Sequence, residues 1–307
     1  MEALVVDAGS KLLKAGAAIP DQSPPMLIPS QMKRMVDNGD VSSSAVTVLE
    51  DVTLLDPIER GFIRDWDATE DLLSYVVYTG LGWEEGNEGN ILFTDPLYTP
   101  KEQLVQLMFE TFNVSGFYAS EQAVLSLYGA GRISGCTVDI GHGKIAHCLG
   151  GTDLTKLFVQ ELGKSNPLVN LSMSDVETLK EQYASCAEDE IAYEKTQNCE
   201  IELHTLPDGQ NDGPLVSSEN HRQLLEYTVL CGGTTSMTGF EGRFQKEANL
   251  CSSAIRPMLV KPPEYMPESL GLYSAWVGGA ILAKVVFPQN QHVTKADYDE
   301  TGPSVEH

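Results

Sequence analysis

Two stretches, LVVDAG at Leu4–Gly9 and CTVDIG at Cys136–Gly141, follow the same pattern. Each is a short apolar run, typical of a buried strand, that ends in Asp-x-Gly, typical of a tight turn. A glycine in such a turn lets the backbone approach a phosphate, and successive N–H groups form an anion-binding nest. The aspartate at the strand end can hold a hydrated Mg²⁺ against that phosphate. Two such turns facing each other predict a triphosphate clamped between two domains.

A third stretch supports this interpretation. Residues Thr228–Thr235 read as a strand that runs into two glycines, Gly232 and Gly233, where the backbone can pass close to an adenosine. Each piece alone has an ordinary alternative. Asp-x-Gly is also a common hairpin turn, and a glycine pair also introduces helices. The matched pair of turns, together with the third stretch, favours a nucleotide cleft.

Strand and helix patterns alternate along the rest of the chain, which predicts an α/β fold. Residues Asp21–Asp51 are rich in Pro, Ser, Asn and Gly and are expected to form a mobile surface region outside the core. A capping box at Ser174–Glu177 predicts the start of a helix. A further strand is expected at residues 90–94, and helices after Asp65, at 104–112, Gln122–Tyr128 and Thr152–Leu162, and after Phe240.

Composition narrows the classes of function. The 307-residue chain has a net charge of −24, which disfavours direct binding to nucleic acid and favours basic protein partners. The chain has neither a signal-peptide pattern at its start nor an apolar run long enough to span a membrane, so we expect no membrane partner and a location on the nucleus–cytosol side. The six cysteines are widely spaced, and we expect reduced thiols that are mostly buried, without a zinc site.

Five further segments carry a resemblance to a known family. They are Pro57–Gly61, Phe109–Asn113, Gln122–Tyr128, Gly232–Thr235 and Tyr298–Ser304. With the two Asp-x-Gly turns, these segments look like those of actin nearly letter for letter, and the resemblance runs from end to end of the chain. Within the actin family, Gly80–Gly86 and Val260–Ser304 look most like the plant nuclear actin-related proteins of the seventh class. The resemblance implies an actin-like ATPase fold of class α/β, with two similar RNase H-like domains around a nucleotide cleft.

The resemblance also implies a cofactor, ATP or ADP with Mg²⁺, and assigns residues to it. Asp7 and Asp139 would hold Mg²⁺ through water. Gln122 and Asp139 would be the catalytic residues, with Gln122 orienting the attacking water. The residues expected to bind the nucleotide are Asp7, Gly9, Ser10, Lys14, Asp139, Gly141, Lys180, Glu181, Gly232, Gly233 and Thr234.

Three departures from the actin pattern predict that ATP hydrolysis is weak or absent. Lys11 replaces a glycine of the first phosphate loop, where its side chain either crowds the γ-phosphate or faces solvent. His142 replaces an aspartate and removes a carboxylate from the water shell of Mg²⁺. Leu272 replaces a lysine near the adenine. Nucleotide binding is expected to survive these changes.

The resemblance places a first domain at residues 1–135, with 273–307 packing back on it, and a second domain at 136–272. Two family segments are missing from the second domain, one after Lys144 and one after Gln210. Their loss would expose sheet edges and apolar faces. Because domains have only about 5–15 kcal/mol of stability to spare, we expect a poorly folded or short-lived product.

The function implied by the resemblance is that of a non-polymerising structural subunit in a SWI/SNF-type chromatin-remodelling complex. The expected location is the nucleus, with the cytoplasm as a second location. Its partners would be a basic helix of the remodelling motor and other actin-related proteins. Four residues match a groove for an apolar helix face, namely Tyr128, Gly131, Leu282 and Val285. Core packing is an equal alternative for Leu282 and Val285.

Two other functions are alternatives. A cytoskeletal actin-like protein with ATP-dependent assembly is the main alternative, although Arg60 replaces a histidine of the actin segment at Pro57–Gly61. A metabolic phosphotransferase of the same superfamily is disfavoured, because no additional sugar-site base follows the second turn.

Overall fold

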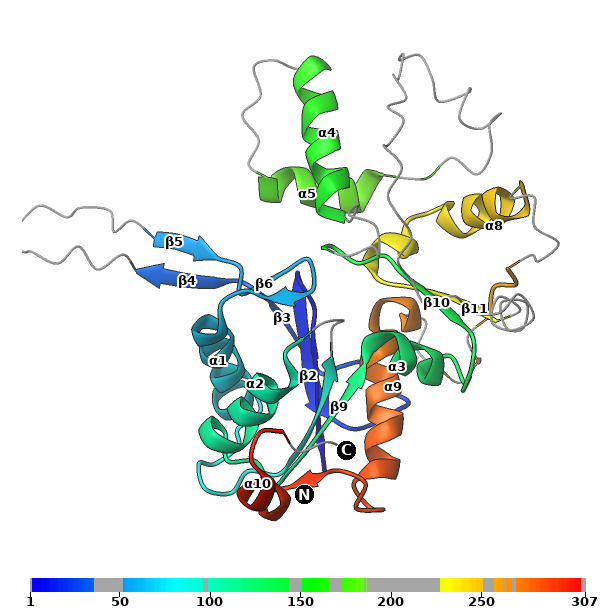
Figure 1. The fold of residues 1–307 in the computed structure, drawn as a ribbon. Coiled ribbons are helices and arrows are strands. Elements are labelled where there is room, and N and C mark those ends of the chain that lie inside the picture. The colour runs from blue at the N-terminus through cyan, green and yellow to red at the C-terminus, as the bar shows by residue number, and fades with distance from the viewer. Residues whose placement is uncertain are drawn as a thin grey trace, which may run out of the picture.

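The computed structural model describes residues 2–35, 52–95, 99–143, 151–165, 173–184, 186, 227–250, 257–261, 263, 264, 266 and 269–304. Its largest sheet has six strands in the order β12-β9-β8-β1-β2-β3 (Figure 1). In chain order these strands are β1 (Leu4–Ala8), β2 (Leu12–Ala17), β3 (Met26–Pro29), β8 (Asn90–Asp95), β9 (Gly116–Glu121) and β12 (Val293–Thr294).

The six-stranded sheet and the helices that pack on its two faces form three layers, called the first unit below. The central strand β1 contributes side chains to both faces. It pairs antiparallel with β2 and parallel with β8, and all five of its residues are buried, as its continuous apolar sequence predicts. Successive side chains point to opposite faces. Leu4 and Val6 therefore join one hydrophobic cluster, whereas Val5 joins another with Trp276.

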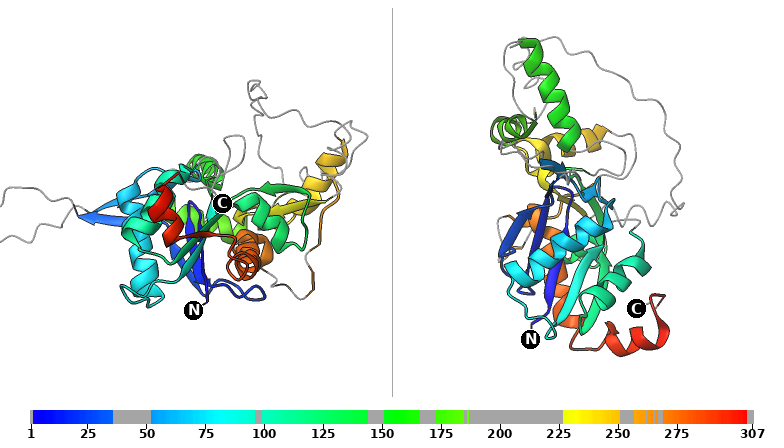
Figure 2. Two further views of the ribbon diagram at one scale, coloured as in Figure 1. Left: turned by 60° about the horizontal axis from the view of Figure 1, so that its bottom comes forward. Right: turned by 90° about the vertical axis from the view of Figure 1, so that its left-hand side faces the viewer.

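Helices cover both faces of this sheet (Figures 1 and 2). On one face lie α1 (Trp66–Ser74) and α2 (Lys101–Gln106), each continued by a π-helical turn, at Tyr75–Gly80 and Leu107–Thr111. On the other face lie α3 (Gln122–Gly129) and α9 (Leu270–Val286). The chain closes with α10 (Lys295–Thr301), which begins at a capping box between Thr294 and Asp297.

The second sheet is much smaller. Among the described residues it consists of β10 (Cys136–Asp139) and β11 (Thr228–Cys231), which run parallel, with an additional bridge between Thr228 and Leu259. Near it lie α4 (Gly151–Ser165), α5 (Met173–Tyr183), α8 (Phe240–Leu250) and a 3₁₀ turn at Gly233–Ser236. Helix α9 contacts β1 and β8 of the first sheet and β11 of the second, so it joins the two.

Two antiparallel pairs complete the described structure. Strands β4 (Met32–Met35) and β5 (Val52–Leu55) form a ribbon, and β6 (Ile58–Glu59) and β7 (Phe62–Ile63) form a hairpin. The hairpin turns at Arg60 and Gly61, whose φ angles of 50° and 78° lie in the left-handed region.

Two sequence predictions were wrong. Residues 26–29 and 32–35 form strands β3 and β4 inside the region expected to be mobile, because β2 and β5 provide partners for them. The helix predicted from Ser174 begins at Met173, so Ser174 lies inside it, and the side chain of Glu177 forms ion pairs elsewhere instead of closing a capping box. Both corrections come from contacts between residues far apart in the chain.

The other predicted strands and helices are confirmed where the structure describes them. No helix in the described ranges combines the length and apolarity that a membrane crossing requires. Of the three described cysteines, Cys231 is buried, whereas Cys136 and Cys186 are only partly buried. The other three cysteines and the predicted junctions after Lys144 and Gln210 lie outside the described residues.

Candidate functional site

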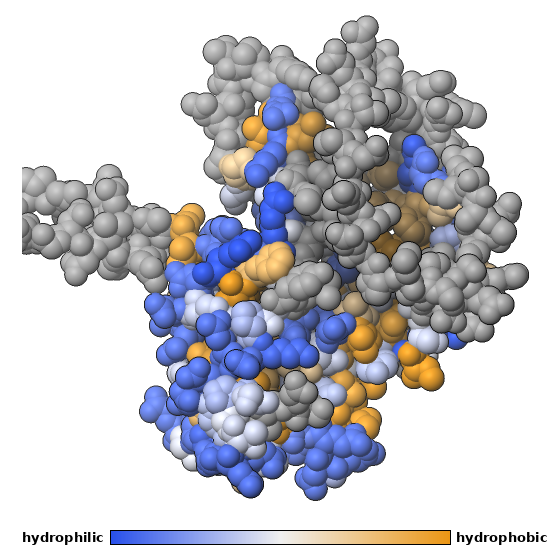
Figure 3. Space-filling model, in the orientation of Figure 1, coloured by the Kyte–Doolittle hydropathy of each residue, from blue (hydrophilic) through white to orange (hydrophobic). Residues whose placement is uncertain are grey.

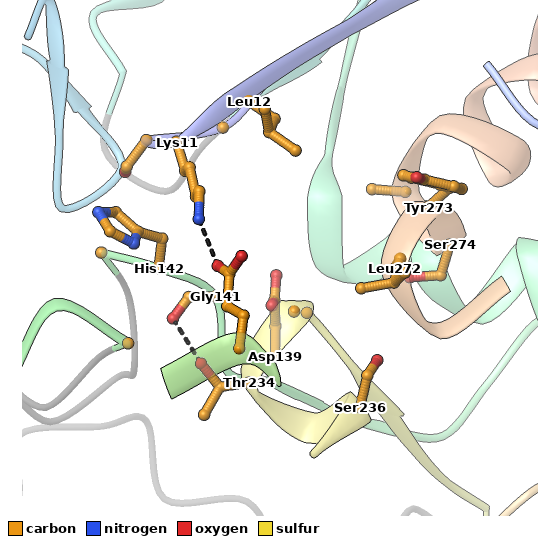
Figure 4. Close-up of a pocket in the computed structure, with 18 of the residues that line it drawn as sticks. Lys11, Leu12, Asp139, Gly141, His142, Thr234, Ser236, Leu272, Tyr273 and Ser274 are labelled. Atoms are coloured by element: carbon orange, nitrogen blue, oxygen red, sulfur yellow. Dashed lines mark hydrogen bonds and ion pairs between the residues drawn. The ribbon is translucent and has the colours of Figure 1, made fainter. Parts of the chain in front are cut away.

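One cleft of about 540 Å³ contains every residue that the sequence assigned to the nucleotide and to catalysis. It lies where the turns after β1, β10 and β11 meet helix α5 and the start of α9 (Figure 4). Residues from the first unit and residues around the second sheet therefore line the same space. Among the predicted residues that line it are Asp7, Gly9, Ser10, Lys14, Gln122, Asp139, Gly141, Lys180, Glu181, Gly232, Gly233 and Thr234.

The turn after β1 is held closed by backbone and hydroxyl contacts. The amide of Gly9 donates to the carbonyl of Leu12 at 3.2 Å. A Cβ atom at Gly9 would lie 2.9 Å from that same oxygen, so the turn requires a glycine. Ser10 fixes the turn against the β6–β7 hairpin, because its Oγ accepts from the amide of Gly61 at 2.8 Å.

Asp7 is the buried anchor of this turn, with 3% of its surface exposed. Its Oδ2 accepts from Lys14 Nζ at 2.8 Å, and its Oδ1 accepts from Thr94 Oγ1 at 2.6 Å and from Gln122 Nε2 at 3.0 Å. Three donors thus already surround the carboxylate. This arrangement fits a Mg²⁺ ion held through water, as the sequence predicts, better than direct coordination, because Mg²⁺ usually keeps several of its waters.

The turns after β10 and β11 are built against each other. Gly232 has φ of 90°, and a Cβ atom there would overlap Asp139 Oδ1 and lie 2.6 Å from the carbonyl carbon of Ile140. The amide of Thr234 donates to the Ile140 carbonyl at 2.9 Å, and its hydroxyl donates to the Gly141 carbonyl at 3.3 Å. The glycine pair thus lets the backbone of the third stretch lie directly beside Asp139.

Lys180 and Glu181 reach the cleft from α5, and they behave differently. Lys180 is buried and donates to the Gly151 carbonyl at 2.9 Å and to Thr155 Oγ1 at 2.7 Å, so its ammonium ties α5 to α4. Burial lowers the pKa of Lys180 below its ordinary value of 10.5. Glu181 is instead paired with Lys11 across the cleft.

The three departures from the actin pattern all line this cleft. Lys11 does not face solvent freely, since its ammonium contacts Glu177 and Glu181 of α5. His142 Nδ1 lies 2.8 Å from Glu177 Oε1, and burial lowers the pKa of His142 although Glu177 acts in the opposite direction. Leu272 is 39% exposed and offers an apolar side chain to the cleft opposite Gly233.

Two residues of the site were missed by sequence reasoning. Thr94 holds Asp7, and its position was readable in principle, because β8 runs parallel to β1 and the carboxyl ends of parallel strands meet at one sheet edge. Glu177 forms an ion pair with Lys11 and a polar contact with His142, but in the sequence it fits a capping box, which predicts a different role for its side chain.

The four residues predicted to form a partner groove lie away from the cleft, on and after α3 and on α9. Tyr128 and Leu282 are partly buried against the same hydrophobic cluster. Gly131 is exposed with φ of 72°, and Val285 is 42% exposed. Val285 is therefore not core, which removes one of the two alternatives for it. Apolar surface gathers over α3 and α9 (Figure 3).

A large sheet and a parallel strand pair that meet at a cleft of Asp-x-Gly turns define an actin-like architecture. Comparison with known proteins agrees, since the family model described as Actin matches residues 1–148 and 215–307. The chain therefore belongs to the actin family.

Individual relatives narrow the resemblance. The chain is 74% identical to actin-related protein 7 of Arabidopsis thaliana over 360 residues, which cover 100% of this chain and 99% of the relative. It is 59% identical to actin-related protein 7 of Oryza sativa subsp. japonica, with the same coverage. Actin-like protein 9 of Homo sapiens is 28% identical over 99% of this chain and 86% of its own length. The resemblance to the seventh class of actin-related proteins is thus confirmed.

Proposed function

We propose that the chain is a nucleotide-binding actin-related protein that does not polymerise and serves as a structural subunit of a nuclear SWI/SNF-type chromatin-remodelling complex. The observation that carries this proposal is the convergence of the predicted nucleotide residues, from three separate turns and α5, on one cleft. Full-length similarity to actin-related protein 7 supports the same choice.

ATP or ADP with Mg²⁺ is the ligand that this cleft suits. The glycine turns after β1 and β10 offer backbone amides to phosphates, and Lys14 supplies a cation beside them. Asp7 and Asp139 would hold Mg²⁺ through water, which gives the phosphates a divalent counter-charge. Gly232, Gly233 and Thr234, which follow β11, line the same cleft and leave room for the nucleoside.

A structural role fits the altered catalytic groups. Gln122 is tied to Asp7 and Thr94 through Nε2, so its position is set, and its amide oxygen would orient a water. His142 stands where the actin pattern has an aspartate. Burial lowers the pKa of His142, which favours its neutral imidazole. A neutral imidazole brings no negative charge to the water shell of Mg²⁺, whereas a carboxylate does, and this difference supports weak or absent hydrolysis.

The proposed partners are a basic helix of the remodelling motor and other actin-related proteins. The net charge of −24 favours a basic partner. Val285, exposed on α9 one helical turn from Leu282, offers an apolar anchor for such a helix. A nuclear location, with a possible cytoplasmic pool, follows from this role.

Nucleotide binding is tested by the melting temperature of the chain with and without excess Mg-ATP. A ligand that binds only the folded state stabilises it by about 2.7 kcal/mol at 100 times its dissociation constant, so a clear upward shift is expected. The variant Gly233→Leu should lose the shift, because a side chain there fills the cleft, where the nearest atom is 3.9 Å away. The matched control Gly271→Leu lies outside the lining residues and should keep it. Equal shifts in both variants would argue against this site.

Partner binding is tested by co-purification with a peptide spanning the basic helix of a remodelling motor. Val285→Glu should weaken capture at least tenfold, because it places a charge in an apolar contact. Leu54→Glu changes an apolar residue on the β4–β5 ribbon that is 55% exposed, more than the 42% of Val285, and it should not weaken capture. Capture that both variants reduce equally, or pelleting of the chain with nucleotide and salt, would contradict the proposal.

A further inference from the structure

The cleft is bridged by charged side chains at the end where the two Asp-x-Gly turns meet. Lys11 extends from the turn between β1 and β2, and its Nζ lies 3.0 Å from Glu177 Oε1 and in contact with Glu181 Oε1. Both glutamates belong to α5. Figure 4 shows the ammonium of Lys11 pointing across the cleft, away from its own strand.

One carboxylate serves both turns. The Oε1 atom of Glu177 that pairs with Lys11 also lies 2.8 Å from His142 Nδ1, and His142 belongs to the turn after β10. Glu177 thereby links the first unit to the second sheet. Burial acts against the charge of Lys11, but the carboxylates of Glu181 and Glu177 raise its pKa above the ordinary value of 10.5, so it stays an ammonium.

The turn after β10 also packs closely against the side chain of Ser10 and against the β6–β7 hairpin at this point. A Cβ atom at Gly143 would lie 2.8 Å from Ser10 Oγ and 2.9 Å from Arg60 Cα, so even a methyl group has no room there. The cleft is therefore narrow beside the ion pairs, independently of how the charged side chains are placed.

Lys180, the neighbouring cation, does not pair with Glu177 in place of Lys11. Lys180 lies one turn from Glu177 on α5, but its donors are directed to the Gly151 carbonyl and to Thr155. The side chains of Lys11 and Glu177 are 32% and 20% exposed, so solvent screens this pair less than a pair on the open surface.

We propose that Lys11, Glu177 and Glu181 form a charge clasp, to which the imidazole of His142 adds a polar contact, and that this clasp holds the two turns together without ligand. An entering nucleotide must take Lys11 from its carboxylates. The proposal rests on the nucleotide binding proposed above and describes how it is controlled. The phosphates are anions that compete with Glu177 and Glu181 for the same ammonium. Weakening the clasp therefore speeds association.

The test combines two measurements on Glu177→Gln and Lys11→Gln. In stopped-flow mixing with a fluorescent ATP analogue and Mg²⁺, each variant should associate about tenfold faster, the factor that corresponds to 1.4 kcal/mol. The double variant should gain little beyond either single variant, because both break the same contact. Lys284→Gln, which breaks the remote pair with Glu2 at 2.8 Å, serves as the control and should leave the rate unchanged.

Hydrogen exchange of the ligand-free protein separates the clasp from nucleotide binding. Amides at residues 9–12 and 141–143 should exchange faster in Glu177→Gln than in the parent chain. Unchanged exchange overturns the clasp whether or not nucleotide binds. Unchanged association with intact binding overturns the clasp and leaves the proposed nucleotide site standing, whereas a parent chain that binds no nucleotide overturns both. If Glu177→Gln does not fold, Lys11→Gln tests the same contact from the other side.

Discussion

The two sheets differ in how well the strand that precedes each Asp-x-Gly turn is packed. Strand β1 lies between β2 and β8 and is buried throughout, with helices on both faces. Strand β10 has the same sequence pattern, but all four of its residues are only partly buried, and the described part of its sheet holds two strands. The same local sequence pattern is therefore buried to different extents, because burial depends on the strands and helices that pack around each strand.

The largest expected effect comes from the joint between the two sheets. A Cβ atom at Gly278 in α9 would overlap the carbonyl oxygen of Leu125 in α3 and lie 3.0 Å from its Cα. Gly278→Ala should therefore separate α3 from α9 and lower the free energy of unfolding by about 3 kcal/mol, measured by chemical denaturation. Gly271→Ala, in the first turn of α9 with no atom closer than 3.9 Å, should cost little. Equal losses would show that α9 tolerates neither change for reasons of helix conformation.

Sequence reasoning predicted most of this architecture because its signals are local. An apolar run followed by Asp-x-Gly indicates a strand and a turn without knowledge of the partner strand. The alignment with the Arabidopsis relative runs over 360 residues, more than the 307 of this chain, so parts of that relative have no counterpart here. That the missing segments fall after Lys144 and Gln210 stays a prediction.

What the sequence could not show are contacts that depend on distant partners. Strand β3 is four residues long and alternates between partly buried and exposed positions, so only its pairing with β2 makes it a strand. Glu177 fits a capping box locally, yet its partners Lys11 and His142 are far from it in the sequence. Ion pairs of this kind leave no periodic pattern.

A smaller effect is expected from a comparison of one buried valine in each sheet. Val6→Ala in β1 and Val229→Ala in β11 remove the same atoms from residues that are 1% and 5% exposed. At about 0.8 kcal/mol for each buried carbon, either change should cost about 1.5 kcal/mol before any cavity is counted. The cost at Val6 should be the larger, because its packed surroundings leave a cavity that cannot collapse. An equal or larger cost at Val229, measured by chemical denaturation, would mean that the smaller sheet is as well supported as the larger one.

The expectation of a poorly folded or short-lived product remains a prediction, and this pair of variants sharpens it. A stable first unit with a weakly supported second sheet would unfold in two steps. A single cooperative transition would show that α9 couples the two sheets strongly enough to unfold as one.

The placement of the tryptophans has a spectroscopic consequence. All three lie in the first unit or on the helix that covers it, since Trp66 and Trp83 pack on the larger hydrophobic cluster and Trp276 is fully buried in α9. Intrinsic fluorescence will thus report the environment of the six-stranded sheet and stay nearly silent about the strand pair. Circular dichroism reports the secondary structure of both sheets. A difference between the melting curves from fluorescence and from circular dichroism would therefore show that the smaller sheet unfolds separately.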